Sequence, residues 1–330
     1  ERSRGLGDVY KRQVVVKGFT TANVQAACDK AAAEGIPVVY FPAGKYVIKG
    51  VNIPAGLTLL GEGSKTFISS VRNGLIFRAA GDNIRITRMK LYGLNPTPAK
   101  YSDSCCLQAR GVKNIRVDHC EVTAFARALY FSKGAVGQVD HCHIHHNCWS
   151  GLGYGVTSVG DGTMVLVCDN IFHSNRHTVT SNSGEAYYLF RYNHILDVKD
   201  CAPGDNLSQC DVHSGLTPKG AFVVEYNIFE NCKGGLGCWA GRGIVRGNIF
   251  RNLMYGIHIT SKVPHEIYGN TFEKVRRPYQ GVARKNSKMP RPIDVPYMME
   301  MDSTGIIRIF KKDTTAYYTG SGKCPLAKLR

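Results

Sequence analysis

The stretch from Val139 to Gly215 decides the fold, because it contains three versions of one short pattern: VDHCHI (139–144), VCDNIF (167–172) and FRYNHI (190–195). Outside this stretch the pattern recurs as VDHCEV (117–122), VEYNIF (224–229), VRGNIF (245–250) and IYGNTF (267–272). The fourth positions are separated by 22, 28, 23, 34, 21 and 22 residues and are Cys120, Cys142, Asn170, Asn193, Asn227, Asn248 and Asn270. The chain therefore repeats with a period of about 22 residues, and two repeats carry insertions.

This pattern is typical of a coil that stacks on copies of itself. Apolar residues on both sides of the fourth position would fill the core, while an Asn at a tight bend can bond the same bend of the next coil. A propeller blade would need about twice this period, and the consensus of a leucine-rich repeat is absent. The sequence thus predicts an all-β parallel β-helix.

The N-terminal part predicts a cap for this solenoid. Residues 1–13, ERSRGLGDVYKRQ, match nothing downstream, and we interpret them as a non-native leader. Residues 21–34 have apolar positions at helical spacing and end before Gly35, so they predict one short helix. Residues 19–63, with the run YFPAGKY (40–46), resemble the opening coil of pectate-lyase-like right-handed β-helices, in which a helix caps the open end. We therefore expect a capped right-handed parallel β-helix over residues 14–275, and an irregular final coil or C-terminal cap over residues 276–330.

The amino-acid composition limits the classes of molecule that the protein is expected to bind. The chain has 42 Lys and Arg against 25 Asp and Glu, a net charge of +17, which favours acidic polymers unless the charge is simply a solvated basic surface. No recognition motif supports nucleic acid, and no apolar run is long enough to span a bilayer. The twelve cysteines fit stacked buried thiols at least as well as disulfides, so the disulfide pattern stays open. The sequence does not indicate an oligomeric state.

Aligning the coils downstream of each bend predicts a column of polar side chains on one parallel sheet. Strands in such a sheet lie about 4.8 Å apart, so groups from neighbouring coils can converge on one sugar unit. The face that His177 occupies stays open, because a slip of one residue reverses it. The central cluster of this column is Tyr154, Arg176, His177, Asp211 and His213, and its outer members include Tyr130 and His258.

Three stretches in this region are similar to right-handed β-helix repeat proteins of the pectate-lyase-like superfamily: HHNCWSGLGYGV (145–156), NRHTVTSNSGEAYYLFRYN (175–193) and DVHSG (211–215). The chain departs from that pattern at Ser214, which precedes Gly215, and at Glu185, which precedes the tyrosines. The resemblance implies cleavage of a polysaccharide. We expect a carbohydrate-active enzyme that is secreted or lies at the cell surface, although no signal peptide is visible in the sequence.

The residue types favour a lyase acting on an acidic, uronic-acid-containing polysaccharide. Such a β-elimination needs a cation for the carboxylate, which Arg176 supplies, and a base near neutral pH, which is His177 or His213. Tyr154 would donate or relay the proton to the leaving oxygen, and Asp211 would orient a histidine. The residues expected to bind substrate are His146, Asp211, Tyr130, Arg191 and His258.

Three alternatives remain. A glycoside hydrolase needs two carboxyl groups about 5 to 9.5 Å apart, and this region is poor in acids. The second alternative is a non-catalytic carbohydrate-binding or adhesive β-helix. We expect no cofactor, with calcium at Asp205 and Asp211 as the third alternative. A second column at the bends consists of His119, His141, Glu121, His143 and His194, and we interpret it as a solvated polar ladder rather than a metal site. His141, His143 and His145 alternate along one predicted strand, so we expect them to share a face.

Overall fold

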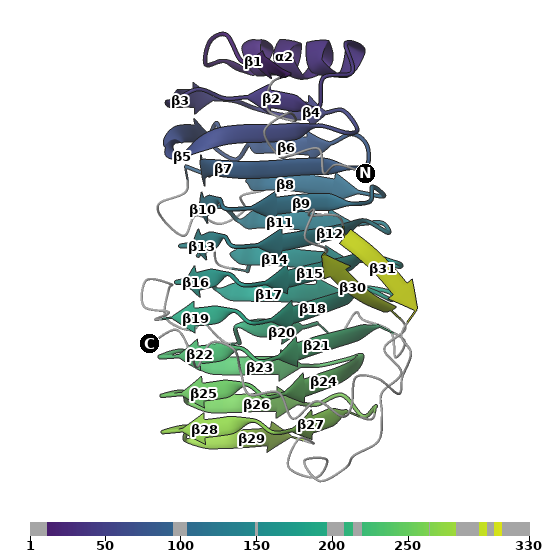
Figure 1. Cartoon of the computed structure of the whole chain (residues 1–330). Helices are drawn as coiled ribbons and strands as arrows, with labels where there is room; N and C mark the ends of the chain where they lie inside the picture. Colours follow the sequence, from purple (N-terminus) through teal and green to yellow (C-terminus); the bar gives the residue numbers. More distant parts are fainter. Residues whose placement is uncertain are drawn as a thin grey trace, which may run out of the picture.

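The chain winds into a stack of parallel coils beneath one helix (Figure 1). This computed structural model describes residues 12–94, 104–148, 151–196, 208–213, 220–263 and 265–281, together with the backbone of two later strands. Each complete coil contributes one strand to each of three walls. The predicted parallel β-helix is confirmed.

The first and second walls form one 19-stranded sheet, because the long strands β5 and β7 pair with strands of both. The first wall contains β1 (Gln13–Val15), β2 (Val38–Tyr40), β5 (Thr58–Ser69), β7 (Ile84–Tyr92), β9 (Ile115–Asp118), β12 (Val136–Asp140), β15 (Met164–Cys168), β18 (Tyr187–Arg191), β21 (Ala221–Glu225), β24 (Arg242–Arg246) and β27 (Glu266–Tyr268). The second wall adds β3 (Gly44–Val47), β10 (Glu121–Thr123), β13 (His143–His145), β16 (Ile171–His173), β19 (His194–Leu196), β22 (Ile228–Glu230), β25 (Ile249–Arg251) and β28 (Thr271–Glu273).

The third wall is a ten-stranded parallel sheet. It contains β4 (Val51–Ile53), β6 (Leu75–Ala79), β8 (Cys105–Arg110), β11 (Arg127–Ser132), β14 (Tyr154–Val159), β17 (His177–Asn182), β20 (Cys210–Val212), β23 (Gly234–Cys238), β26 (Tyr255–Ile259) and β29 (Arg277–Gly281). All strands that we aligned from the sequence as one sheet lie in this wall.

The predicted helix is α2 (Thr21–Ala33), which covers the first coil (Figure 1). Thr20 and Asn23 form a reciprocal capping box that satisfies orphan backbone groups at its start. One face of the helix buries Val24, Ala27, Cys28 and Ala31 against the core. The cap therefore shields the end of the solenoid from further strand pairing.

Buried asparagines connect successive coils at the bend between the first and second walls. The Asn170 amide donates to Asn193 Oδ1 at 3.0 Å, and Asn193 donates to Asn227 Oδ1 at the same distance. The ladder continues through Asn248 to Asn270. The residue before each rung has positive φ, as Tyr192 (58°) and Gly247 (63°) illustrate. The predicted bonding between bends is confirmed.

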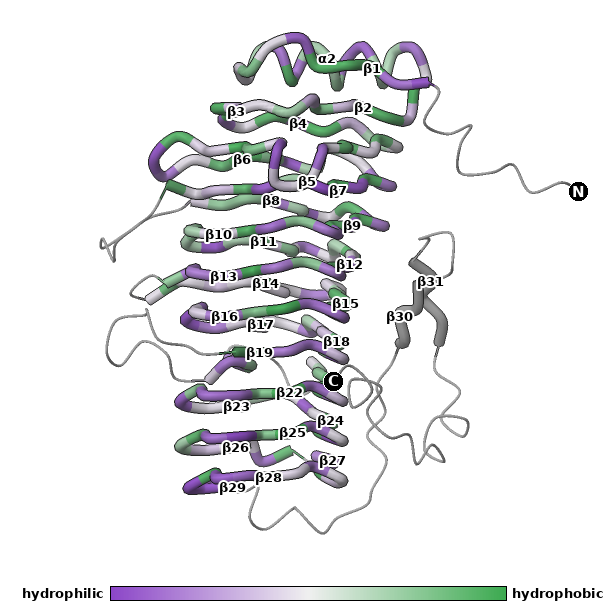
Figure 2. Tube along the Cα trace, turned by 60° about the vertical axis from the view of Figure 1, so that its left-hand side comes forward, coloured by the Kyte–Doolittle hydropathy of each residue, from purple (hydrophilic) through white to green (hydrophobic). Residues whose placement is uncertain are grey.

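The core follows the apolar positions of the repeat. The first position of the pattern is buried in all seven copies, and the sixth position is buried in all but the last, Phe272. The tube in Figure 2 accordingly alternates between hydrophobic and hydrophilic residues along the coils. On the second wall Phe229 stacks on Phe250 with ring centroids 4.9 Å apart, and Phe250 stacks on Phe272 at 5.2 Å.

The ends depart somewhat from the expected boundaries. β1 begins at Gln13, the last residue of the predicted leader, and residues 1–11 lie outside the described residues. At the other end β29 extends the third wall to Gly281, beyond the boundary expected at residue 275. β30 (Tyr297–Met301) and β31 (Ile307–Lys311) then form an antiparallel pair rather than another parallel coil.

Nine cysteines of the described chain are buried free thiols. Burial raises the pKa of Cys142, Cys168 and Cys210 well above the usual value of a thiol, so these groups are neutral core residues.

Within the described residues, no helix is long and apolar enough to cross a membrane.

We expect Asn193→Ala to destabilise the solenoid by about 3 kcal/mol or more, because it leaves several buried polar groups without partners. The Asn193 amide donates to Val167 O, Arg191 O and Asn227 Oδ1, and its Oδ1 accepts from Asn170. The control is Asn52→Ala, since Asn52 is exposed and its Oδ1 accepts from Arg78; this change should cost about 0.5 kcal/mol or less. Urea unfolding followed by circular dichroism measures both, and equal effects would contradict the ladder's role.

Candidate functional site

The outer face of the third wall carries one continuous column of register partners. Its inward neighbours, such as Leu129 and Val179, belong to the core, which places the alternate residues on the outside. In chain order the column consists of Tyr130, Thr157, Thr180, Asp211, Gly237, His258 and Gln280. Adjacent members are one strand apart, so the column defines which side chains can meet.

Asp211 is the centre of this site. Its Oδ2 lies 3.0 Å from His213 Nε2 and 3.7 Å from His177 Nε2, and its Oδ1 accepts from Trp239 Nε1 at 3.0 Å. Burial acts to raise the pKa of Asp211, but the bond to His213 and the two nearby imidazoles, together with Trp239, lower it below the usual value. The carboxylate is therefore ionised at neutral pH and can orient His213. We call Tyr154, Arg176, His177, Asp211 and His213 the Asp211 cluster.

His177 lies beneath the surface rather than in contact with solvent. It begins β17, is only 2% exposed, and its Nδ1 is 2.5 Å from the carbonyl oxygen of Ser208. That carbonyl accepts a hydrogen bond from Nδ1–H, which leaves the Nε2 lone pair on the side of Asp211. Burial lowers the pKa of His177 to about 4, so the ring is neutral near pH 7. The sequence left open which face His177 occupies, and the structure shows that its ring is buried.

Tyr154 lies beside both histidines. Its ring centroid is 5.7 Å from that of His177 and 6.2 Å from that of His213, and the guanidinium carbon of Arg176 is 5.9 Å from it. Tyr154 and His177 are register partners on neighbouring strands. Burial raises the pKa of Tyr154 despite the opposing effect of Arg176, so the phenol keeps its proton at neutral pH. The five residues predicted as the central cluster are thus brought together.

Trp239 and His258 extend the cluster along the wall. Trp239 is 40% exposed, its indole N–H donates to Asp211, and its ring centroid is 5.0 Å from that of His258. An exposed indole held in this way can stack on a sugar ring. Between the strands of Asp211 and His258 lies Gly237, where a Cβ would meet Ser208 Oγ at 2.4 Å. A side chain at this position would therefore collide with the Ser208 side chain.

Sequence reasoning missed two residues of this wall, Ser208 and Tyr255. Ser208 accepts from His177, and its hydroxyl lies 3.5 Å from the Tyr255 hydroxyl. Ser208 follows an insertion in the repeat, so its coil position is not visible from the pattern. Tyr255 lies on β26, where its register partners are Gly234 and Arg277. Aligning the sequences of these three strands could have identified Tyr255 as a residue of this wall.

Three predicted substrate-binding residues have their contacts elsewhere. Tyr130 belongs to the column three strands from Asp211 and contacts Arg127. Arg191 ends β18 on the first wall, where its Nε is 3.9 Å from Glu225. His146 contacts His145 and His173 at the end of the second wall. Whether any of them binds substrate stays a prediction. Asp205 and Ser214 lie outside the described residues.

The second column divides into separate groups. His119 stacks on His141 at the first bend, and each Nδ1 is 2.8 Å from the neighbouring Asp118 or Asp140. The expectation that His141 shares a face with His143 and His145 is wrong, because the positive φ of His141 (52°) turns the chain before β13 begins. His194 instead contacts Glu230 at 2.8 Å.

Comparison with known proteins agrees with this architecture. The sequence matches the family described as a right handed beta helix region over residues 73–274, more than half of its length. The chain belongs to this family. No curated protein matches the sequence significantly.

The solved structures similar to this chain include carbohydrate-active enzymes of several kinds. A mannuronic acid specific polysaccharide family 6 lyase from human gut microbiota is 16% identical with a TM-score of 0.56, over 80% of this chain and 65% of that one. The catalytic domain of a GH87 α-1,3-glucanase in complex with nigerose is 10% identical with a TM-score of 0.54, over 84% of this chain and 67% of that one. The Yersinia enterocolitica family 28 exopolygalacturonase is 15% identical with a TM-score of 0.53, over 83% of this chain and 69% of that one. At these identities the likeness establishes the fold.

His177 should make the protein sensitive to acid. Its pKa of about 4 in the folded state lies below the unfolded value of about 6.5, so the unfolded chain binds the proton first and stability falls as the pH drops through this interval. The full difference is about 3 kcal/mol. His177→Gln, which keeps a donor for Ser208, should reduce this loss in urea unfolding measured from pH 7 to pH 4. Identical pH profiles for the two proteins would contradict the assignment.

Proposed function

We propose that the protein is a polysaccharide lyase that cleaves an acidic, uronic-acid-containing polysaccharide by β-elimination at the Asp211 cluster. The observation that carries this proposal is the contact between Asp211 and His213 beside Tyr154 and Arg176. A His–Asp contact by itself is not specific, since His119 and Asp118 form one on another wall. The neighbouring phenol and guanidinium distinguish the Asp211 cluster.

The proposed base is His213. If its Nε2–H donates to Asp211, its Nδ1 carries the lone pair that accepts the proton from the carbon bearing the carboxylate. The electrons of that C–H bond form the new carbon–carbon double bond, and the glycosidic C–O bond breaks at the β-carbon. His213 is preferred over His177 because its side chain is 33% exposed, whereas that of His177 is 3% exposed and lies against Ser208.

Tyr154 and Arg176 would complete the reaction. Arg176 would bind the substrate carboxylate and stabilise the charge that develops when the adjacent proton is removed. Tyr154, whose pKa is raised by burial, keeps the proton that the departing oxygen needs. Afterwards His213 releases its extra proton to solvent, and the Tyr154 phenolate takes up a proton from solvent.

Charge, platform and fold support this substrate class. The net charge of +17 favours a polyanion, and the exposed face of Trp239 offers a stacking surface next to Asp211. The fold is shared with a mannuronic acid specific lyase, whose substrate is a uronate. An extracellular polymer as substrate would place the protein outside the cell or at its surface.

Hydrolysis is the second candidate, because a glucanase and an exopolygalacturonase share the fold. Hydrolases of this kind use two carboxyl groups. Among the described side chains in contact with Tyr154, His177 and His213, Asp211 supplies the one carboxylate. Both of its oxygens already accept N–H groups, which also argues against calcium at Asp211. The arrangement therefore favours elimination.

Activity on a panel of uronate polymers tests the proposal. Elimination creates an unsaturated product, so ultraviolet absorbance should rise with the wild type, and both His213→Ala and Tyr154→Phe should lower kcat/KM about 100-fold to 10,000-fold. The matched control is His119→Ala, which removes a histidine from another His–Asp pair and should leave the rate unchanged. Reducing ends without absorbance would indicate hydrolysis. Binding without any turnover would indicate a non-catalytic carbohydrate-binding protein.

A further inference from the structure

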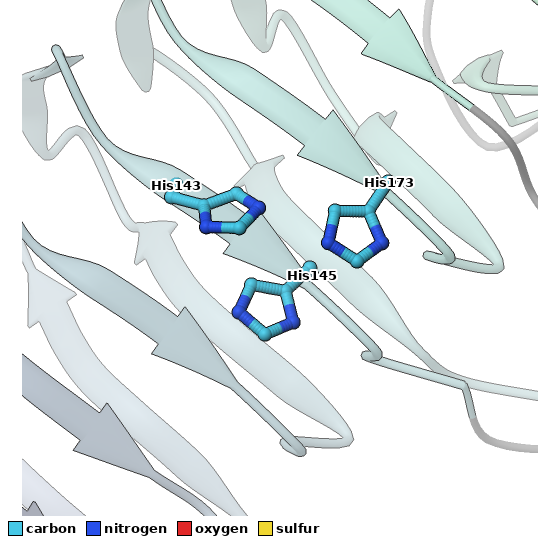
Figure 3. Close-up of side chains that lie close together, drawn as sticks. All are labelled: His143, His145 and His173. Carbon is cyan, nitrogen blue, oxygen red and sulfur yellow. The ribbon is translucent and has the colours of Figure 1, made fainter.

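Three histidines outside the Asp211 cluster meet on the second wall (Figure 3). His143 and His145 are two residues apart on β13, so their side chains emerge on the same face. His173 lies on β16 as the register partner of His145. We call these residues the three-histidine cluster. The regular stacking of coils therefore holds two of its members side by side on neighbouring strands.

The imidazoles of the cluster are in mutual contact. Ring centroids are 4.2 Å apart for His143 and His145, 4.9 Å for His143 and His173, and 4.7 Å for His145 and His173. One ring nitrogen of each residue lies within 4.8 Å of one ring nitrogen of each other residue. Nitrogens bound to one tetrahedral zinc ion, with bonds of about 2.0–2.1 Å, lie roughly 3.3 Å apart. Rotations about the soft terminal torsions can close this gap without moving the strands.

The residues around the cluster prepare one nitrogen for a metal. His145 Nε2 is 3.2 Å from Glu121 Oε1, and Glu121 is held by Lys90 Nζ at 2.6 Å. If Nε2–H donates to Glu121, the lone pair of His145 is on Nδ1. That Nδ1 lies 2.6 Å from His146 Nδ1, a separation that requires one shared proton. A metal ion at His145 Nδ1 would displace this proton, leaving the carboxylate of Glu121 as the partner that orients the ring.

A contrast within the same protein separates this cluster from a ladder of solvated rings. His119 and His141 also stack, at 5.0 Å, but each Nδ1 contacts a buried aspartate. That pair offers two rings, whereas three nitrogens converge in the three-histidine cluster. Three imidazoles suit zinc and other first-row transition metals and not calcium or magnesium, which prefer oxygen ligands.

We propose that His143, His145 and His173 bind one divalent first-row transition metal ion, with zinc as the best match, and leave a fourth position for water or an anion. Glu121 positions His145 in this site. Three protein ligands and an open position are the arrangement of zinc sites that bind an exogenous ligand. The site lies on the second wall and takes no part in the elimination proposed for the third wall, so either proposal can fail without the other.

Zinc titration of tag-free, metal-stripped protein by calorimetry tests the site. The wild type should bind one zinc ion per chain with micromolar or tighter affinity, and calcium should give no signal. H143A/H145A/H173A should weaken zinc binding about 100-fold or more, since each ligand contributes to the affinity. The matched control H119A/H141A removes two stacked surface histidines and should bind zinc like the wild type. Cobalt bound in place of zinc should show the visible absorption spectrum of a site with few ligands. Cobalt ions in water without the protein do not show this spectrum.

The proposal is overturned if the wild type shows no saturable binding, if the triple variant keeps its affinity, or if the control loses it equally. Circular dichroism establishes that each variant is folded. Should the triple variant not fold, the native protein still decides the question through modification by diethyl pyrocarbonate with peptide mapping. Zinc must protect His143, His145 and His173 while His119 and His141 remain as reactive as before; uniform protection or none contradicts the site.

Discussion

The hydrogen bonds between asparagine side chains of successive bends are the constraint on which the rest of the structure depends. Each rung uses its amide to join one coil to the next and to bond backbone carbonyls that would otherwise be buried without donors. Because a bend can align only with its own counterpart, the ladder fixes the register of the strands on both sides. A slip by one residue would expose the apolar column and break the rungs together.

Register is also what creates chemistry on the third wall. Tyr154, His177 and Asp211 are separated by up to 57 positions in the chain, yet they lie on three consecutive strands, β14, β17 and β20. The same stacking buries His177, lowers its pKa and leaves His213 at the accessible edge of the carboxylate. The difference between the two histidines is thus a difference of environment, which decides which one can exchange protons with a bound substrate.

Much of this arrangement could be predicted from the sequence, because a repeated bend residue reveals the coil period directly. The period led to the parallel β-helix and to the alignment that gathers the Asp211 cluster, while the helical spacing of residues 21–34 led to the capping helix. The face of His177 could not be predicted, since side chains alternate with a period of two and the strand start was uncertain. The turn at His141 was missed because a non-glycine residue there adopts positive φ. Ser208 was missed because the insertion before it hides the repeat.

The two polar groups divide the outer surface between two kinds of recognition. The third wall presents a carboxylate between imidazoles with a phenol, a guanidinium and an indole nearby, which suits an anionic sugar. The second wall presents three imidazoles, which suits a metal ion. Both follow from the same stacking rule, because residues at equivalent positions of successive coils become neighbours whatever their distance along the chain.

The most direct measurement is a crystal structure of Tyr154→Phe with a uronate oligosaccharide bound. We predict one sugar unit on the third wall, its carboxylate against Arg176 and the adjacent hydrogen directed at Nδ1 of His213, with Asp211 holding Nε2. A sugar bound on another wall, or an Asp211 that contacts neither histidine, would contradict it.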